Sequence, residues 1–134
     1  MAERLAQGLL DTSVVIDLET IPASDLPLEV AICAITLAEL AAAPAATTDV
    51  DERARRQDRL QRTESAFDPI PFDLEAARSY ARVYAAVVAQ GRKPRRRLAD
   101  LLIASVALAE CLPVITRNPD GFIGLERLID VTTV

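Results

Sequence analysis

The sequence predicts an α/β domain whose parallel sheet is covered by helices on both faces. Short apolar runs alternate with longer segments of helical pattern, an order typical of parallel strands joined by helical crossovers. The runs show little polar alternation, which favours strands that are buried on both faces. The chain has 134 residues, enough for a real hydrophobic core, and we expect one domain over residues 1–134.

Five short apolar runs are expected to form the strands, because each is bounded by residues that start a turn or a helix. Residues 20–29 hold two prolines and no helical period, so we expect a loop there. The expected strands cover residues 5–10, 30–35, a short stretch near Ile70, 112–116 and 128–131, with the last at an edge of the sheet.

Capping and helix-breaking residues set the expected helix boundaries. Asp11 precedes the first helix, Pro44 stops the second, and Gly91 ends the fourth. The third is a charged surface helix, and the fifth is strongly apolar. The expected helices begin at Val14, cover 36–43, run from a cap at Thr47, Thr48 or Asp49 to about residue 65, cover 74–90 after a cap at Asp73, and cover 98–110.

Composition excludes several classes of function. The absence of histidine removes Ser-His-Asp and Cys-His nucleophilic sites, and zinc sites that need histidine. Cys33 and Cys111 lack metal-ligand spacing and are expected to be buried in the core. No apolar stretch reaches the roughly 18 residues that a membrane span needs, and the N-terminus does not resemble a signal peptide. We therefore expect a cytoplasmic protein without membrane contact.

The charge is unevenly distributed along the chain. The net charge is −5, but five cations lie within six residues, so the remainder carries −10. Such a basic patch is enough to contact phosphate, although a solvated loop with helix-flanking charges would look the same. The five cations are Arg92, Lys93, Arg95, Arg96 and Arg97.

Four acidic residues, far apart in sequence, are predicted at strand ends or helix starts. They are Asp11, Glu39, Asp100 and Asp120. In an open α/β sheet, residues just past the carboxyl ends of the strands converge on one crevice. Four carboxylates meeting there would repel each other unless a cation lay between them, and oxygen ligands suit Mg²⁺ or Mn²⁺. The pattern therefore predicts a metal site that can activate water and stabilise a phosphoryl group.

Each acid also has a purely structural interpretation. Asp11 could cap the helix after it, and Glu39 could close a capping box with Thr36. Asp100 could be a favourable anion in the first turn of its helix, and Asp120 a turn residue. Their joint position at one sheet edge favours the metal site. Four neutral residues beside the acids could hydrogen-bond to them or simply cap turns, namely Thr12, Ser13, Thr116 and Asn118.

The same residues carry a resemblance to the PIN-domain ribonucleases, and more closely to the VapC toxins of bacterial toxin–antitoxin pairs. Four pieces match in the family's order and span nearly the whole chain. They are Leu10-Asp11-Thr12-Ser13-Val14-Val15-Ile16-Asp17, Ile35-Thr36-Leu37-Ala38-Glu39-Leu40, Ala99-Asp100-Leu101-Leu102-Ile103-Ala104 and Thr116-Arg117-Asn118-Pro119-Asp120-Gly121-Phe122.

The resemblance implies a three-layer α/β sandwich with a central twisted parallel sheet, and Mg²⁺- or Mn²⁺-dependent endonucleolytic cleavage of RNA. It implies that Asp11, Glu39, Asp100 and an acid of the last piece form the metal site. It also implies homodimers, hetero-oligomers with a VapB-type antitoxin encoded alongside, and contact with DNA only through that antitoxin. The basic segment 92–97 would then steer the RNA backbone toward the acids.

The chain departs from the family pattern in the last piece. Many relatives carry an acid directly before the phenylalanine, where this chain has Gly121, and Asp120 comes one residue earlier. Asp120 is the chosen fourth site residue, with Asn118 as the alternative. The departure keeps a second hypothesis open, in which the chain is a catalytically degenerate PIN-like module that binds RNA or protein.

Two other enzyme classes fit the residues less well. A phospho-acceptor receiver domain needs a lysine at the end of a late strand, but the only lysine is Lys93 in the basic segment. A haloacid-dehalogenase-like phosphatase opens on Asp-x-Asp, whereas Ser13 holds the second position here.

Overall fold

Four parallel strands in the order β2-β1-β3-β4 form the middle layer of the structure, a computed structural model that describes residues 4–134. Helices cover both faces of this sheet, as the sequence predicts. The strands are β1 Gln7–Leu10, β2 Glu29–Ala31, β3 Val114–Thr116 and β4 Val131–Thr133. The α-helices are α1 Thr12–Ile16, α2 Ala34–Ala42, α3 Val50–Ala66, α4 Leu74–Ala89 and α5 Leu98–Glu110.

Neighbouring residues of the central strands point to opposite faces and build two separate cores. Leu9 and Val114 are fully buried against the side chains of α4 and α5. Leu10 and Ile115 are fully buried on the other face, against α1, α2 and α3. Because successive side chains of a strand alternate between faces, a run that is apolar throughout requires cover on both sides. The three-layer sandwich is therefore confirmed.

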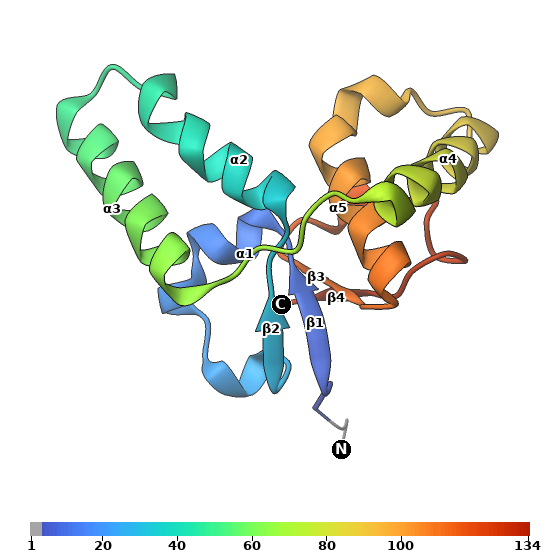
Figure 1. Cartoon of the computed structure of the whole chain (residues 1–134), viewed down its shortest axis with the longest axis horizontal. Coiled ribbons are helices and arrows are strands. Elements are labelled where there is room, and N and C mark those ends of the chain that lie inside the picture. Colours follow the sequence, from blue (N-terminus) through green and yellow to red (C-terminus); the bar gives the residue numbers. More distant parts are fainter. Residues whose placement is uncertain (1–3) are drawn as a thin grey trace.

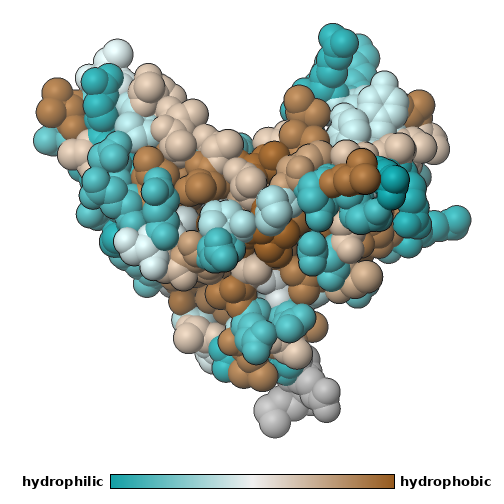
Figure 2. Space-filling model, in the orientation of Figure 1, coloured by the Kyte–Doolittle hydropathy of each residue, from teal (hydrophilic) through white to brown (hydrophobic). Residues whose placement is uncertain are grey.

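The helices form two arms. α2 packs against α3, and α4 packs along α5, so that one pair lies on each side of the sheet's central strands (Figure 1). Figure 2 shows that the surface is deeply hollowed between the two arms. None of the helices in residues 4–134 combines the length and the apolar character needed to cross a bilayer.

Most element boundaries agree with the sequence prediction, and helix capping explains several of them. The side chain of Asp49 accepts hydrogen bonds from the backbone N–H groups of Asp51 and Glu52, and Asp73 caps α4 through Ala76. The predicted helix over 98–110 coincides with α5.

Three strand predictions are wrong. The run 30–35 was expected to be extended throughout, but β2 ends at Ala31 and α2 begins at Ala34. Ile70 makes only a single bridge to Cys33, because Pro69 and Pro71 beside it cannot donate to a ladder. The final strand begins at Val131 rather than spanning 128–131, since the residues before it turn to pack on the core.

The prediction for one of the cysteines is also wrong. Cys33 is fully buried, and burial raises the pKa of its thiol. Cys111 is exposed and ends α5 in the left-handed conformation, with φ of 56°. It sits where the chain turns sharply from α5 into β3, a position that is set by backbone geometry rather than by apolar character.

Candidate active site

The strand order places a crevice between β1 and β3. After β1 the chain crosses to β2 on one side, and after β3 it crosses to β4 on the other, so the two connections diverge. Such a switch point, at the carboxyl ends of parallel strands, is where open α/β sheets bind their ligands. Asp11 follows β1 directly and Thr116 ends β3, so both lie at this point.

Asp11 is a buried carboxylate, 3% exposed, that three donors hold in place. Its Oδ1 atom accepts hydrogen bonds from Ser13 Oγ at 2.5 Å and from the backbone N–H of Val14 at 3.3 Å. Its Oδ2 atom accepts one from Thr116 Oγ1 at 2.6 Å. A buried charge requires such partners, and together they fix the direction of the carboxylate. The bond to Val14 also makes Asp11 the N-cap of α1, so the structural and site roles coexist.

The segment after β3 completes this network through its backbone. The N–H of Arg117 donates to Ser13 Oγ at 3.1 Å, and the N–H of Asn118 donates to Thr116 Oγ1 at 2.9 Å. Both hydroxyls therefore receive one hydrogen bond and donate another to Asp11. Three of the four predicted neutral neighbours thus contact the acids through their side chains, whereas Asn118 contributes its backbone.

Glu39 projects from α2 toward the same edge. Its Oε1 atom accepts a hydrogen bond from Thr12 Oγ1 at 2.6 Å, and Thr12 Oγ1 lies 3.2 Å from Thr36 Oγ1. The capping-box alternative is wrong, because α2 begins at Ala34 with Cys33 as its N-cap. Thr36 is fully buried and accepts a hydrogen bond from Thr12. The three-residue spacing between Thr36 and Glu39 suggested a capping box and did not indicate this contact.

Asp100 lies in the first turn of α5, and its surroundings raise the pKa of its carboxyl to about 6. Burial is the main cause, and the charges of Asp11 and Glu39 add to it. The nearby Arg97 opposes the shift but does not offset it. Asp100 does occupy the first turn of α5, as its structural alternative requires, but the net effect of its surroundings disfavours the charged carboxylate. The charges of Asp11 and Glu39 therefore both lie close enough to Asp100 to act on its carboxyl.

The fourth predicted residue is placed differently. Asp120 is exposed in the short helix η5, Pro119–Phe122, and it is not among the charges that raise the pKa of Asp100. Asn118, the alternative, is also exposed. Over residues 4–134, no three acidic or cysteine side chains are grouped tightly enough to form a ready metal cage.

Gly121 contacts Asp100, and the sequence analysis did not predict this contact. Its backbone packs directly on the carboxylate of Asp100, and a Cβ atom added at Gly121 would lie 2.2 Å from Oδ2. Glycine is therefore needed here for space. The signal was present as the departure from the family pattern, but its meaning depends on a contact between η5 and α5 that no local pattern reveals.

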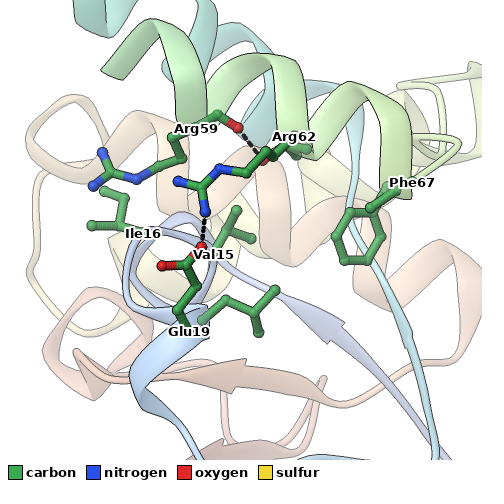
Figure 3. A pocket seen from close by; sticks show the side chains of 9 residues that line it. Val15, Ile16, Glu19, Arg59, Arg62 and Phe67 are labelled. Atoms are coloured by element: carbon green, nitrogen blue, oxygen red, sulfur yellow. Dashed lines mark hydrogen bonds and ion pairs between the residues drawn. The ribbon is translucent and has the colours of Figure 1, made fainter. Parts of the chain in front are cut away.

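A second hollow lies away from these acids, between α3 and the segment α1–η1, where η1 covers Leu18–Thr20 (Figure 3). Its floor is apolar and includes Val15 and Phe67, and an ion pair between Arg62 and Glu19 lies across it. None of the four predicted site residues lines this hollow. The hydrogen-bonded carboxylates, rather than the depth of the surface, therefore mark the candidate active site.

Comparisons with known proteins agree with this geometry. A family model described as the PIN domain matches residues 8–128. The chain is 42% identical over 141 residues to Ribonuclease VapC5 of Mycobacterium tuberculosis, covering 100% of this chain and 98% of that protein. It is 40% identical over 101 residues to Ribonuclease VapC8 of the same species, covering 75% and 89%.

A solved structure extends the similarity to three dimensions. The crystal structure of VapBC-5, a member of the VapBC family of toxin–antitoxin systems from Mycobacterium tuberculosis, superposes with a TM-score of 0.79 at 36% identity. The match covers 96% of this chain and 98% of that one. The chain therefore belongs to the PIN-domain family and, within it, to the VapC ribonucleases.

Proposed function

We propose that this chain is the toxin of a type II toxin–antitoxin pair and acts as a metal-dependent endoribonuclease. One observation carries the proposal: Asp11, Glu39 and Asp100 converge at the switch point of the sheet. The full-length similarity to a protein named a ribonuclease supports RNA as the substrate. The phosphatase and receiver hypotheses have no such support.

The donor set fits a hard divalent cation. All three converging groups are carboxylates, and two of them raise the pKa of the third, so a cation would relieve their repulsion. Mg²⁺ keeps several waters and takes few protein ligands, which suits acids that do not form a closed cage. Asp11 and Asp100 would hold Mg²⁺ or Mn²⁺, with Glu39 bound directly or through water. The bound cation supplies an activated water and neutralises charge on the phosphoryl group.

The protein's own groups fix the geometry. The hydroxyls of Thr116 and Ser13 donate to the carboxylate of Asp11 and fix its orientation, and the hydroxyl of Thr12 does the same for Glu39. Asp120 is proposed to complete the site or to position the attacking water, with Asn118 as the alternative. Both residues are exposed, so a substrate could reach them.

A VapB-type antitoxin is the proposed partner. The matched crystal structure is of a VapBC toxin–antitoxin system, which supports such a partner here. Outside the basic segment, the chain carries −10, and this charge favours a basic partner segment. An arginine or lysine of that segment would pair with the converging carboxylates and displace the cation. Homodimers and larger complexes with the antitoxin are proposed as well.

Metal removal tests the catalytic proposal. We expect purified protein to cleave single-stranded RNA in Mg²⁺ or Mn²⁺, to lose that activity in EDTA, and to regain it when metal is restored. Because water rather than the 2′-hydroxyl attacks, the products should carry no 2′,3′-cyclic phosphate, which end-group analysis measures. Undiminished cleavage in EDTA, or cyclic phosphate ends, would contradict the proposal.

Replacing Thr116 by valine tests the support of Asp11. The change keeps the volume of the side chain but removes the 2.6 Å hydrogen bond to the carboxylate. We expect cleavage to fall about 10- to 100-fold, the usual cost of losing a group that orients a metal ligand. Thr63→Val is the matched control, because that hydroxyl is also buried but donates within α3, at 2.8 Å to the carbonyl of Arg59. Equal loss of activity in both variants would mean that stability, and not the orientation of Asp11, is at stake.

A further inference from the structure

An open hollow of about 370 Å³ lies between the end of α4 and the start of α5. The short helix η4, Pro94–Arg97, forms part of it at the free end of the α4–α5 arm (Figure 1). Its lining consists of one glycine and four cations, and we call it the basic notch. The lining residues are Gly91, Arg92, Lys93, Arg96 and Arg97. Arg95 adds a fifth cation to the same turn.

The cations of the basic notch lack partners. Within residues 4–134, none of the five side chains makes an ion pair or a hydrogen bond, and all five residues are exposed. The arginines of α3 behave differently: Arg55 and Arg56 pair with Glu52, and Arg62 pairs with Asp58 and Glu19. Arg53 of α3 donates to the backbone carbonyls of Pro44 and Thr47, so that among the arginines of this helix only Arg59 lacks a partner within the described residues. Four cations around a hollow, with a fifth in the same turn, create a local positive potential that attracts an anion.

The basic notch adjoins the candidate active site. Arg97 lines the notch and directly precedes α5, and Asp100 lies in the first turn of that helix. A strand whose scissile phosphate lies at the acids would therefore bring a neighbouring phosphate within reach of these cations.

We propose that the basic notch is a phosphate-binding subsite for the RNA strand that flanks the cleaved bond. This proposal rests on the proposed function. The lining holds no aromatic side chain on which a base could stack, so the notch contributes affinity and register without reading sequence. Its recognition is electrostatic, and each phosphate that it neutralises releases counterions and makes binding depend on salt.

A double substitution, Lys93→Gln with Arg96→Gln, tests the proposal. These two cations line the notch, and neither adjoins α5 directly as Arg97 does. Arg78→Gln with Arg82→Gln is the matched control, because it removes the same charge from exposed positions on α4. The probe is a uridine dodecamer, and binding is measured by fluorescence anisotropy over a series of salt concentrations, with Asp100→Asn present to prevent cleavage.

We expect the notch variant to bind the probe at least tenfold more weakly at 0.1 M salt. The steepness of the plot of log K against log salt should fall by about 1.4. Each phosphate of a single strand that the protein neutralises contributes about 0.7 to this slope, and the variant loses two such contacts. The control should bind less than twofold more weakly and keep its slope. With Asp100 restored, the notch variant should show a raised KM and little change in kcat.

Two results would contradict the proposed subsite but leave the proposed ribonuclease function unaffected. The first is an unchanged affinity and slope in a protein that still cleaves RNA. The second is normal RNA affinity with weakened binding of an acidic partner segment, which would assign the notch to a protein partner. A wild-type protein that fails to cleave RNA in Mg²⁺ or Mn²⁺ would instead contradict the proposed function itself.

Discussion

Asp100→Asn is expected to remove cleavage almost completely, by about 10³-fold or more, while the fold stays intact. Asparagine keeps the size of the side chain but lacks the charge that would hold a cation, and a 10³-fold loss corresponds to about 4 kcal/mol of transition-state stabilisation. Single-turnover cleavage of RNA measures the loss. Asp68→Asn, which removes an exposed carboxylate elsewhere, is the control and should leave the rate unchanged.

Retained cleavage in Asp100→Asn would remove this residue from the site. RNA binding that ignores both the metal and Asp11 would favour the alternative, a degenerate binding module. The two hypotheses therefore predict different results: an endoribonuclease both binds and cleaves RNA, whereas a degenerate module only binds it.

The same substitution should stabilise the protein at neutral pH when metal is absent. The pKa of Asp100 is raised from 3.8 to about 6, so the folded state binds the proton more tightly than the unfolded state does. The cost of the ionised carboxylate is therefore absent below pH 3.8, grows as the pH rises to about 6, and is constant above that. Because the side chain is partly exposed, we expect a gain of about 1–2 kcal/mol.

Urea unfolding of the wild type and of Asp100→Asn, in EDTA at pH 3.5 and pH 7.5, measures this gain. The two proteins should be equally stable at the lower pH and differ at the higher. Added Mg²⁺ should then raise the Tm of the wild type more than that of the variant, because a ligand stabilises the state that binds it. A gain that is the same at both pH values would mean that ionisation is not its cause. Stability lost at a carboxylate cluster is the expected accompaniment of a functional site.

The sequence predicts the position of a residue of this site where neighbouring residues set that position, and not where a contact with a distant segment sets it. The positions of Asp11 and Asp100 were predictable because each follows or opens an element whose boundary is marked by a change in pattern, and α5 in particular is bounded as expected. Glu39 was placed on the right helix, although the helix starts two residues earlier than expected. The metal-site prediction from these positions needed only the rule that parallel strands end at one edge.

The sequence did not predict where β2 ends and α2 begins, because one apolar run covers the end of the strand and the start of the helix. The residues 30–35 are apolar throughout, and fully buried strands and buried helix starts cannot be told apart by periodicity. The chain turns into α2 after Cys33, because the backbone of Ala34 and that of Ile70 pair at this point. Such a pairing between distant segments leaves no local signal, and the same is true of the contact between Gly121 and Asp100.

Gly121→Ala should reduce kcat for cleavage by about 10- to 100-fold, the range found when a group that orients a metal ligand is disturbed. The added Cβ would lie 2.2 Å from Oδ2 and 2.8 Å from Cγ of Asp100, far inside van der Waals contact. η5 cannot retreat easily, because Phe122 is 2% exposed and anchored in the core. The carboxylate of Asp100 must therefore turn away. Gly124→Ala is the control, since its φ of +94° strains the backbone away from the acids, and it should lose stability but keep its rate.

A double-substitution cycle decides whether Gly121 acts through Asp100. If alanine at this position only displaces the carboxylate, then Gly121→Ala combined with Asp100→Asn should be no less active than Asp100→Asn alone. If the two losses multiply, alanine distorts the site more widely and Gly121 is not a positioning residue for Asp100. The family pattern places an acid at this position, where this chain has no room for any side chain while Asp100 keeps its place. An acid at position 121 and the observed Asp100 thus exclude each other, so the fourth acid that we propose for this site, Asp120, lies outside that position.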